Sequence, residues 1–420
     1  MVLKYTVKGI GIWLMCALFF LYEFLLRTVI GTFQHPIMYD LNLSAIEFSM
    51  LSSTFYLLIY AIMQVPVGLI VDRFGLKKSL FVGAFICASA SIGFAYANTY
   101  IYAALFRFLT GFGSAFGFIC LLVAVYDWLP QKNRALLIGI SQFIGTMGPM
   151  IAAGPFEALA KSGDIDWRLL FTYLGIIGFV LSAAILSVVQ NNKEKSGRYI
   201  VLKRPEGILK TIRHIFSKKQ AWYIALFSAL VYFSLEYLSE NEGKSFLILK
   251  GISSLDASFM ITISWLGYAL GCPFLGWLSD FTQKRKPALL IAALACSFGI
   301  TGIVYADQIN MLRASFLLLG LGASGQSVSF ALMSEQFKKP YLAASLSLNN
   351  MAITTLTAIN APVISWALTN SAGSGSPTLI EYRFIFNGLI GFVCLSVIVT
   401  LYFLKETYCK SVSDFTYLSR

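Results

Sequence analysis

The sequence predicts an all-α membrane protein with about twelve transmembrane helices, arranged as two pseudo-symmetric bundles of six. Of its 420 residues, 57% are hydrophobic and only 12% are charged, whereas a soluble domain has roughly 25% charged residues. The chain is long enough for about twelve apolar segments of roughly 20 residues with short connections. This composition excludes a soluble globular protein.

Apolar segments separated by charged residues, prolines and polar clusters define the expected spans. Six of them precede a polar segment that carries nine Lys and Arg, Asn191 to Lys219, and six follow it. We therefore expect an N-terminal bundle at 1–190, a basic cytoplasmic connector at 191–219 and a C-terminal bundle at 220–420. The predicted spans are residues 10–34, 46–71, 79–97, 99–122, 134–160, 169–190, 221–241, 255–278, 287–305, 309–332, 342–369 and 384–404.

The distribution of Lys and Arg predicts the topology, because cytoplasmic loops retain positive charge. Of the 32 Lys and Arg residues, 24 fall on one side of the predicted spans and six on the other, while Arg27 and Arg107 lie within spans. Both chain ends are therefore predicted to be cytoplasmic, in a bacterial-type inner or plasma membrane. The formal charge of +12 is explained by this topology, and no nucleic-acid-binding motif accompanies it.

The two halves repeat one sequence pattern at the end of the second and eighth spans. Residues 68–78 read G-x-x-x-D-R-x-G-x-K-K, and residues 276–286 carry Gly, Asp and basic residues at corresponding positions. A glycine permits close helix approach, and Asp with Arg or Lys can form a breakable ion pair at a helix seam. A solvated basic loop is the alternative, but it does not require Gly and Asp at the same offsets twice.

This pattern resembles the signature loop of the major facilitator superfamily, and the resemblance covers essentially the whole chain. It implies secondary transport between two six-helix halves, with the solute site at mid-membrane. It also implies a conformational latch, formed by Gly68, Asp72, Arg73, Asp280 and Arg285. The Gly and Pro residues of span five and Trp167-Arg168 before span six resemble further superfamily features. We expect close packing at the former and an interfacial anchor at the latter.

Charged residues inside the spans are the sharpest functional candidates, because a charge at membrane depth is costly and normally faces a cavity or a partner. Glu23 and Arg27 lie one turn apart in span one, where they can pair or hold a solute. Span four contributes Arg107, and span seven contributes Glu236. Glu240 and Glu242 lie nearer the outer end of span seven.

Arg27 and Arg107 are the first choices for solute binding, because a guanidinium offers a rigid fork of donors for carboxylate or phosphate groups. The alternative is structural: Arg107 could pair with Glu23 or cap a backbone carbonyl. Glu23 is the candidate proton-coupling residue, with a permanent salt bridge to Arg27 as its alternative. Further substrate-binding candidates, each with helix-interface packing as the alternative, are Tyr22, Tyr56, Tyr60, Gln64, Gln142, Glu236, Gln326, Asn350 and Asn360.

Within the superfamily, an acid and an Arg in span one followed by an Arg in span four resemble the organic-anion:proton symporter branch. The chain is also similar to nutrient and siderophore carriers of intracellular bacteria. Two departures stand out. In that branch the acid and Arg of span one are commonly adjacent, and a second acid follows the span-four Arg by seven residues, where this sequence has Ser114. Glu23 is thus the one obvious proton site of the N-terminal half.

The leading functional hypothesis is proton-coupled uptake of a small polar or anionic solute, such as an organic acid, an amino acid-like nutrient or a carboxylate siderophore, by alternating access. Its expected partners are the solute, protons and the lipid bilayer, and a single chain is expected to suffice. The alternatives are a proton-antiport exporter and a nontransporting sensor of the same fold. No phosphate loop, zinc motif or catalytic triad is recognisable, so neither an enzyme nor a cofactor or metal site is expected.

Overall fold

The computed structural model describes residues 6–129, 134–161, 166–191, 213–337, 342–372 and 375–410, and within these ranges the chain is helical without any strand. The side chains of Val65, Leu69, Asp72, Arg73, Tyr126, Lys161, 134–138 and 342–344 are outside this description. Within the described chain the all-α prediction is confirmed. Most of the predicted connector, residues 192–212, lies outside the described residues, so the predicted bundle boundaries stay a prediction.

The helices of the N-terminal half are long, and most spans are continued or interrupted by a shorter helix. Their bounds are α1 (Val7–Thr32), α2 (Gln34–Asp40), α3 (Ala45–Ser49), the π-helical turn η1 (Met50–Thr54), α4 (Phe55–Phe74), α5 (Leu76–Ala95), α6 (Tyr100–Ser114), α7 (Phe116–Trp128), α8 (Arg134–Ala152), α9 (Gly154–Lys161) and α10 (Trp167–Val188).

The C-terminal half has corresponding spans, but its second and fifth spans are the single helices α15 (Ser254–Thr282) and α19 (Leu342–Ala372). Its other elements are α13 (Lys219–Glu240), α14 (Gly243–Leu249), α16 (Lys286–Tyr305), α17 (Ile309–Ala323), α18 (Gly325–Glu335), α20 (Leu379–Ile398) and η4 (Val399–Phe403). Spans four and ten are each interrupted after a 15-residue helix, at Ala115 and Ser324. Corresponding helices also contain a proline, Pro66 and Pro273 in one pair, Pro149 and Pro362 in the other. Proline removes a backbone donor and bends a helix, so the repeated pattern is visible in the backbone.

Eleven helical segments of the described chain are long and apolar enough to cross a membrane. They coincide with eleven of the predicted spans. The remaining predicted span, 134–160, is occupied by α8 and α9, which break at Ala153. Within it, Gly148 packs against α1, since a Cβ there would lie 2.8 Å from the backbone nitrogen of Leu25. The close packing expected of this span is therefore confirmed.

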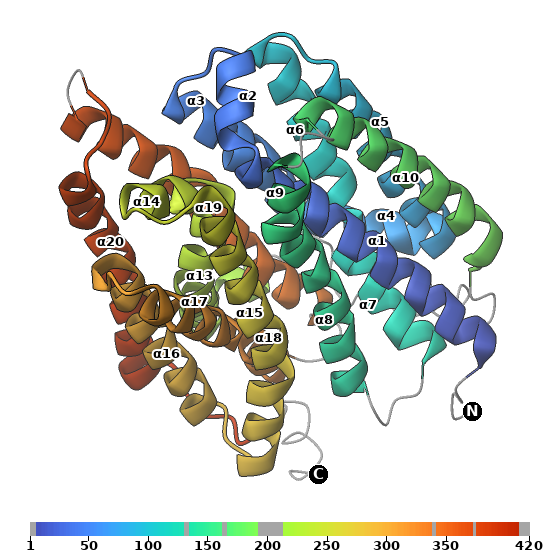
Figure 1. Ribbon diagram of the computed structural model, residues 1–420. Helices are drawn as coiled ribbons and strands as arrows, with labels where there is room; N and C mark the ends of the chain where they lie inside the picture. The colour runs from blue at the N-terminus through green and yellow to red at the C-terminus, as the bar shows by residue number, and fades with distance from the viewer. Residues whose placement is uncertain are drawn as a thin grey trace. The chain divides into compact units, whose positions relative to one another are not determined.

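Contacts divide the chain into two compact units. The first comprises Met1–Tyr199, Tyr237–Thr262 and Thr357–Thr378; the second comprises Ile200–Glu236, Ile263–Leu356 and Leu379–Arg420. Helices α13, α15 and α19 contribute residues to both. In the first unit α5 packs along α10 and α6, and α1 along α8 and α7 (Figure 1). In the second, α16 packs along α17 and α20. The first unit thus contains short segments of the C-terminal half.

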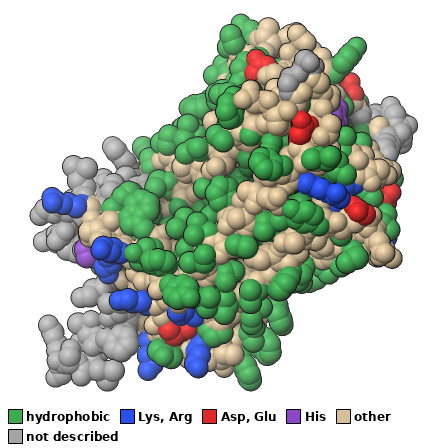
Figure 2. All heavy atoms as spheres, turned by 90° about the vertical axis from the view of Figure 1, so that its left-hand side faces the viewer, with side chains coloured by type: hydrophobic (Ala, Val, Ile, Leu, Met, Phe, Trp, Pro, Cys, Tyr) green, Lys and Arg blue, Asp and Glu red, His purple; other side chains and the backbone are tan. Residues whose placement is uncertain are grey.

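The surface is apolar, as a chain in lipid requires. Figure 2 shows a face on which hydrophobic side chains cover most of the area between charged groups near its edges. In the second unit, exposed apolar side chains recur along α16 and α20, among them Ile291, Phe298, Phe384 and Ile398. Buried serines, threonines and amides lie inside the helix packing instead. This reversal of the soluble pattern places the helices in a membrane.

Each copy of the repeated sequence pattern contains a residue with positive φ. Gly75, which ends α4 and precedes α5, has φ 83° and ψ 163°, a region that is essentially restricted to glycine. Its counterpart in the second copy is Gln283, with φ 52°. Both copies thus have a positive φ at this position, but the turns differ in length, since one residue separates α4 from α5 and three separate α15 from α16.

Substitution of Gly75 by alanine is expected to destabilise the protein by about 1–3 kcal/mol. The backbone angles disfavour any Cβ, and that Cβ would also lie 2.7 Å from the side chain of Asn191, which accepts a hydrogen bond from the Lys77 backbone N–H at 3.0 Å. Thermal unfolding of the purified protein in detergent measures the effect. Gln283→Gly is the matched control and should be neutral or slightly stabilising. Equal melting of Gly75→Ala and wild type would contradict the described turn.

Candidate functional site

Glu23 lies on α1 inside the first unit, and its carboxylate is enclosed by other helices. The residue is 2% exposed, and its Oε2 accepts a hydrogen bond from the Tyr56 hydroxyl at 3.0 Å. Gly117 on α7 leaves room for it, since a Cβ there would lie 3.0 Å from the Glu23 Cγ. A carboxylate withdrawn from water in this way needs compensation by a hydrogen bond, a cation or a proton.

Arg27 follows one turn later on α1. It is paired with Glu240, a glutamate for which the sequence predicts no role. Its Nε donates to Oε1 of Glu240, the last residue of α13, at 3.0 Å. Arg27 is 6% exposed and Glu240 fully buried. In the sequence, Glu240 is recognisable only as an acidic residue at the end of an apolar span. The choice between Glu23, a solute and Glu240 as the partner of Arg27 depends on helix packing, which the sequence pattern does not contain.

Arg107, on α6, uses its guanidinium on backbone carbonyls. Nε donates to Leu51 at 3.1 Å, Nη1 to Leu26 at 2.9 Å, and Nη2 to Arg27 at 3.3 Å and Ser52 at 2.9 Å. Two of these carbonyls belong to the π-helical turn η1, where the regular helical bonding pattern is interrupted. These contacts favour the structural alternative for Arg107, and its role in solute binding stays a prediction.

The aromatic and amide candidates of the first unit have separate surroundings. Tyr22 donates to the Leu174 carbonyl of α10 at 2.9 Å, so it joins two helices of the unit. Tyr56 stacks on Tyr60 with ring centroids 6.2 Å apart, and Gln64 donates to the Tyr60 carbonyl at 3.3 Å. Tyr56 also donates to Glu23. Two further candidates, Gln142 on α8 and Asn360 on α19, are half-buried.

Three candidates lie in the second unit. Glu236 is fully buried on α13, Gln326 accepts a hydrogen bond from the Tyr268 hydroxyl at 2.7 Å, and Asn350 is half-buried on α19. The neighbouring Asn349 accepts from Ser228 at 2.9 Å and donates to Ser329 at 3.2 Å. The role of Glu236, Gln326 and Asn350 in solute binding stays a prediction.

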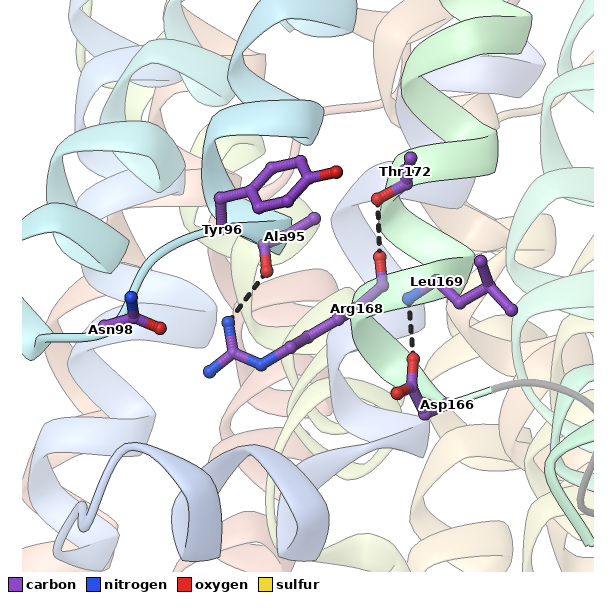
Figure 3. A pocket seen from close by; sticks show the side chains of 7 residues that line it. All are labelled: Ala95, Tyr96, Asn98, Asp166, Arg168, Leu169 and Thr172. Carbon is purple, nitrogen blue, oxygen red and sulfur yellow. Dashed lines mark hydrogen bonds between the residues drawn. The ribbon is translucent and has the colours of Figure 1, made fainter.

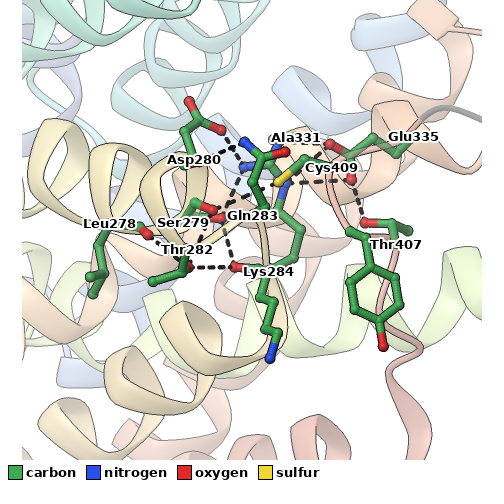
Figure 4. Close-up of polar contacts among 12 residues, drawn as sticks. Leu278, Ser279, Asp280, Thr282, Gln283, Lys284, Ala331, Glu335, Thr407 and Cys409 are labelled. Atoms are coloured by element: carbon green, nitrogen blue, oxygen red, sulfur yellow. Dashed lines mark hydrogen bonds and ion pairs between the residues drawn. The ribbon is translucent and has the colours of Figure 1, made fainter.

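The C-terminal copy of the predicted latch is an ion-pair network within the second unit. Arg285 donates from Nη1 to Asp280 at 2.7 Å and from Nη2 to Glu335, at the end of α18, at 2.6 Å. Figure 4 shows Asp280, Ser279, Glu335 and Thr407 in this network. The Thr407 hydroxyl donates to Glu335. Glu335 and Thr407 were not predicted, because neither belongs to the repeated motif.

Charge pairing tunes the groups of this network that lie outside the candidate spans. Burial opposes the charged form of Arg285, but hydrogen bonds and attraction from Glu335 outweigh it, so the pKa of Arg285 is raised. Partial burial likewise opposes the charged form of Glu406, yet backbone N–H groups of Arg285, Lys286, Tyr408 and Thr407 donate to it and hold its pKa below the ordinary value. This end of the second unit therefore holds charged side chains in fixed positions.

The N-terminal copy of the predicted latch comprises Gly68, Asp72 and Arg73, and Gly276 is the counterpart of Gly68 in the second copy. Gly68 and Gly276 face open space, since a Cβ on either would meet no described atom within 4 Å. No described residue therefore makes the close helix approach that was expected at these glycines. The side chains of Asp72 and Arg73 lie outside the described residues. A latch function for these residues stays a prediction.

An open surface pocket of about 510 Å³ lies beside the end of α5 and the start of α10, lined by residues such as Tyr96, Asp166 and Arg168 (Figure 3). Arg168 donates to the carbonyls of Ala95 and Ala97 at 2.8 and 2.9 Å. Trp167 is only 2% exposed, and the interfacial anchor expected at Trp167-Arg168 stays a prediction. The Trp167 ring packs on the rings of Phe94 and Phe171.

The sequence matches the model of the Major Facilitator Superfamily over residues 14–249 and 243–414. The chain belongs to this superfamily and is a membrane transporter. This confirms the predicted family and the transport class.

Among the similar proteins are transporters that are named for organic acids. The hexuronate transporter of Bacillus subtilis (strain 168) is 25% identical over 301 residues, which cover 67% of this chain and 70% of that protein. The probable L-galactonate transporter of Escherichia coli (strain K12) is 25% identical over 339 residues, covering 75% and 73%. The crystal structure of a D-xylose-proton symporter covers 96% of this chain and 99% of that chain, with a TM-score of 0.75 and 18% identity. The predicted resemblance to organic-anion carriers is confirmed, and the structural likeness confirms the fold.

Proposed function

We propose that this transporter imports a small organic anion together with protons, by alternating access between the halves 1–190 and 220–420. The observation that carries the proposal is the buried acid and arginine of α1, Glu23 and Arg27. In this assignment Arg27 binds the anionic group of the solute and Glu23 carries the proton. Export and solute sensing remain outcomes of the test described below.

The chemistry of the arginine supports a carboxylate solute. A guanidinium forms its strongest hydrogen bonds with carboxylates and phosphates, and burial strengthens them. Hexuronate and galactonate, the solutes named for two similar proteins, each carry one carboxylate on a polyhydroxylated chain. Hydroxyl-rich solutes also need amide partners, which Gln142 and Asn360 of the first unit offer. We therefore propose a sugar acid as the substrate class.

The surroundings of Glu23 support its role in coupling. Its carboxylate is buried and has Tyr56 as a hydrogen-bond donor, while the next charge along the helix, Arg27, pairs with Glu240. A buried carboxylate held by a neutral hydroxyl can exchange a proton, and access to water from alternate sides then lets it take up and release that proton. The excess of Lys and Arg in the loops on one side of the predicted spans supports cytoplasmic chain ends and insertion in a bacterial inner membrane.

Uptake into proteoliposomes with an imposed pH gradient tests this proposal. D-Glucuronate, D-galactonate, D-xylose and a ferric carboxylate siderophore are the solutes compared. One pH unit corresponds to about 1.4 kcal/mol, so one proton per anion supports about tenfold accumulation. Glu23→Gln should retain solute exchange in the absence of a gradient but lose accumulation, because the amide cannot carry a proton. Arg27→Ala should lose both.

Glu47→Gln is the matched control for Glu23→Gln. Glu47 lies on α3 and uses its carboxylate on the cap formed with Ser44, so its replacement should leave gradient-driven accumulation intact. Accumulation by Glu23→Gln equal to that of wild type would exclude Glu23 as the coupling residue. Accumulation driven only by a gradient of the opposite direction would instead favour export, and specific solute binding without any flux would favour a sensor.

A further inference from the structure

Glu240 presents a carboxylate to Arg27 from a different part of the chain. It is the last residue of α13 and is fully buried. One of its oxygens, Oε1, accepts from Arg27 Nε at 3.0 Å. The other, Oε2, is buried and has no hydrogen-bond partner among the described residues. The carboxylate is thus bound through a single oxygen, whereas a carboxylate and a guanidinium can form two parallel bonds.

The segment that carries Glu240 is held against α1 by contacts on either side of it. Asn241 accepts from Ser52 at 2.7 Å and donates to Ser53 at 2.9 Å. Gly31 allows the backbone of the segment to approach α1 closely, since a Cβ there would lie 2.9 Å from the Glu240 Cα. Gly31 is one turn beyond Arg27, so both residues lie on the same face of the helix. Glu240 is therefore positioned on Arg27 by its surroundings.

The charged groups around this pair balance one another. Arg27 and Arg107 are the cations, and the Arg107 guanidinium donates to the backbone carbonyl of Arg27 at 3.3 Å. Glu240 is one carboxylate, and Glu23, one turn before Arg27 on α1, is the other. Tyr56 lies between Glu23 and Arg107, with its ring 4.8 Å from the guanidinium carbon. A further anion can enter such a buried site only if one of the carboxylates moves away or is neutralised.

We propose that Glu240 is an internal competitor for the solute: it occupies Arg27 when the site is empty, and the carboxylate of an incoming organic anion displaces it. This inference rests on the proposed function, because it takes Arg27 as the solute-binding arginine. Displacement exchanges the contact of Arg27 with one oxygen of Glu240 for a contact with the solute carboxylate that can use both of its oxygens. It also explains why a fully buried glutamate oxygen lacks a hydrogen-bond partner in the described chain, since that oxygen belongs to a contact that must remain breakable.

The test uses acetate, the simplest carboxylate, so that it does not depend on which solute is transported. Thermal unfolding of the purified full-length protein is followed as sodium acetate replaces sodium chloride at constant ionic strength. Glu240→Gln keeps the side-chain shape but removes the competing charge. We expect acetate to stabilise this variant at concentrations at least tenfold lower than those needed for wild type. Glu240→Asp, whose carboxylate is one methylene shorter, should lie between the two.

Two controls locate the effect at Arg27. Glu242→Gln removes a carboxylate two residues away that accepts from Gln34 at 3.1 Å, and its acetate response should match wild type. In the double variant Glu240→Gln/Arg27→Gln the enhanced response should disappear. An identical response of wild type and Glu240→Gln, or a response that persists without Arg27, would overturn the proposal. Enhanced acetate binding without sugar-acid transport would retain the competitor and reject the proposed substrate class instead.

Discussion

Replacement of Arg107 by alanine is expected to leave little folded transporter in the membrane. The 1% exposed guanidinium donates to four backbone carbonyls, and hydrogen bonds from charged donors contribute about 1.5–3 kcal/mol each. The substitution removes four hydrogen bonds from a charged donor to α1 and η1 at once. The sum exceeds about 4 kcal/mol, which is a large fraction of the stability of a typical domain.

The yield of monodisperse protein and its melting temperature measure this effect. Arg313→Ala is the matched control, because Arg313 is exposed on α17, the counterpart of α6 in the other half. Its replacement should change the melting temperature little. Arg107→Lys should remain strongly destabilised, since an ammonium is a single point charge and cannot reach carbonyls on two helices as a planar fork does. If Arg107→Ala folds normally and loses only solute binding, the predicted binding role is correct and the structural role is wrong.

The second large effect is expected at Lys244, on α14. Its Nζ contacts Glu157 Oε2 of α9 at 2.6 Å and donates to the Thr32 carbonyl at 3.0 Å. Both side chains of the pair are less than 10% exposed. Removal of one partner leaves an uncompensated buried charge, which costs about 3–5 kcal/mol. Lys244→Met and Glu157→Gln should therefore each lower the melting temperature strongly.

The double variant Lys244→Met/Glu157→Gln decides whether charge is the cause. It should recover most of the lost stability, because no unpaired charge remains, and the coupling between the two sites is read from the double-mutant cycle. Arg383→Gln is the control for an exposed pair: Arg383 contacts Asp307 at 2.8 Å, with the Asp307 side chain 76% exposed, and such pairs contribute about 0–1 kcal/mol. Additive losses in the double variant would show that packing, not charge pairing, explains the effect.

The pair of Lys244 and Glu157 is one of three buried polar contacts that join distant parts of the chain within the first unit; we call them the polar layer. Arg27 meets Glu240, Gln34 meets Glu242, and Lys244 meets Glu157. Three alternating residues of one short segment thus each find a partner on α1, α2 or α9. In some proteins buried polar pairs select one arrangement of the chain over others. We therefore expect this layer to fix how the segment around Glu240 sits on the N-terminal helices.

The sequence by itself determined the class of the protein, because the relevant signals are local. Runs of about 20 apolar residues must become helices in a membrane, where every backbone group needs an internal partner. Positive charge between those runs, and a motif repeated at 68–78 and 276–286, then predict the halves and the superfamily. A positive φ at the corresponding positions Gly75 and Gln283 accompanies this repeat.

Only the tertiary structure decided which buried charges are partners. Arg107 was expected to bind solute or to be structural, and its contacts with carbonyls more than 50 residues away favour the second role. The partner of Arg27 is 213 residues distant, and Glu335 completes the Asp280–Arg285 network from 50 residues away. A sequence shows that a charge within a span needs compensation. Which group provides it depends on how the helices pack, since many pairings satisfy the same local pattern and packing leaves one of them within hydrogen-bond distance.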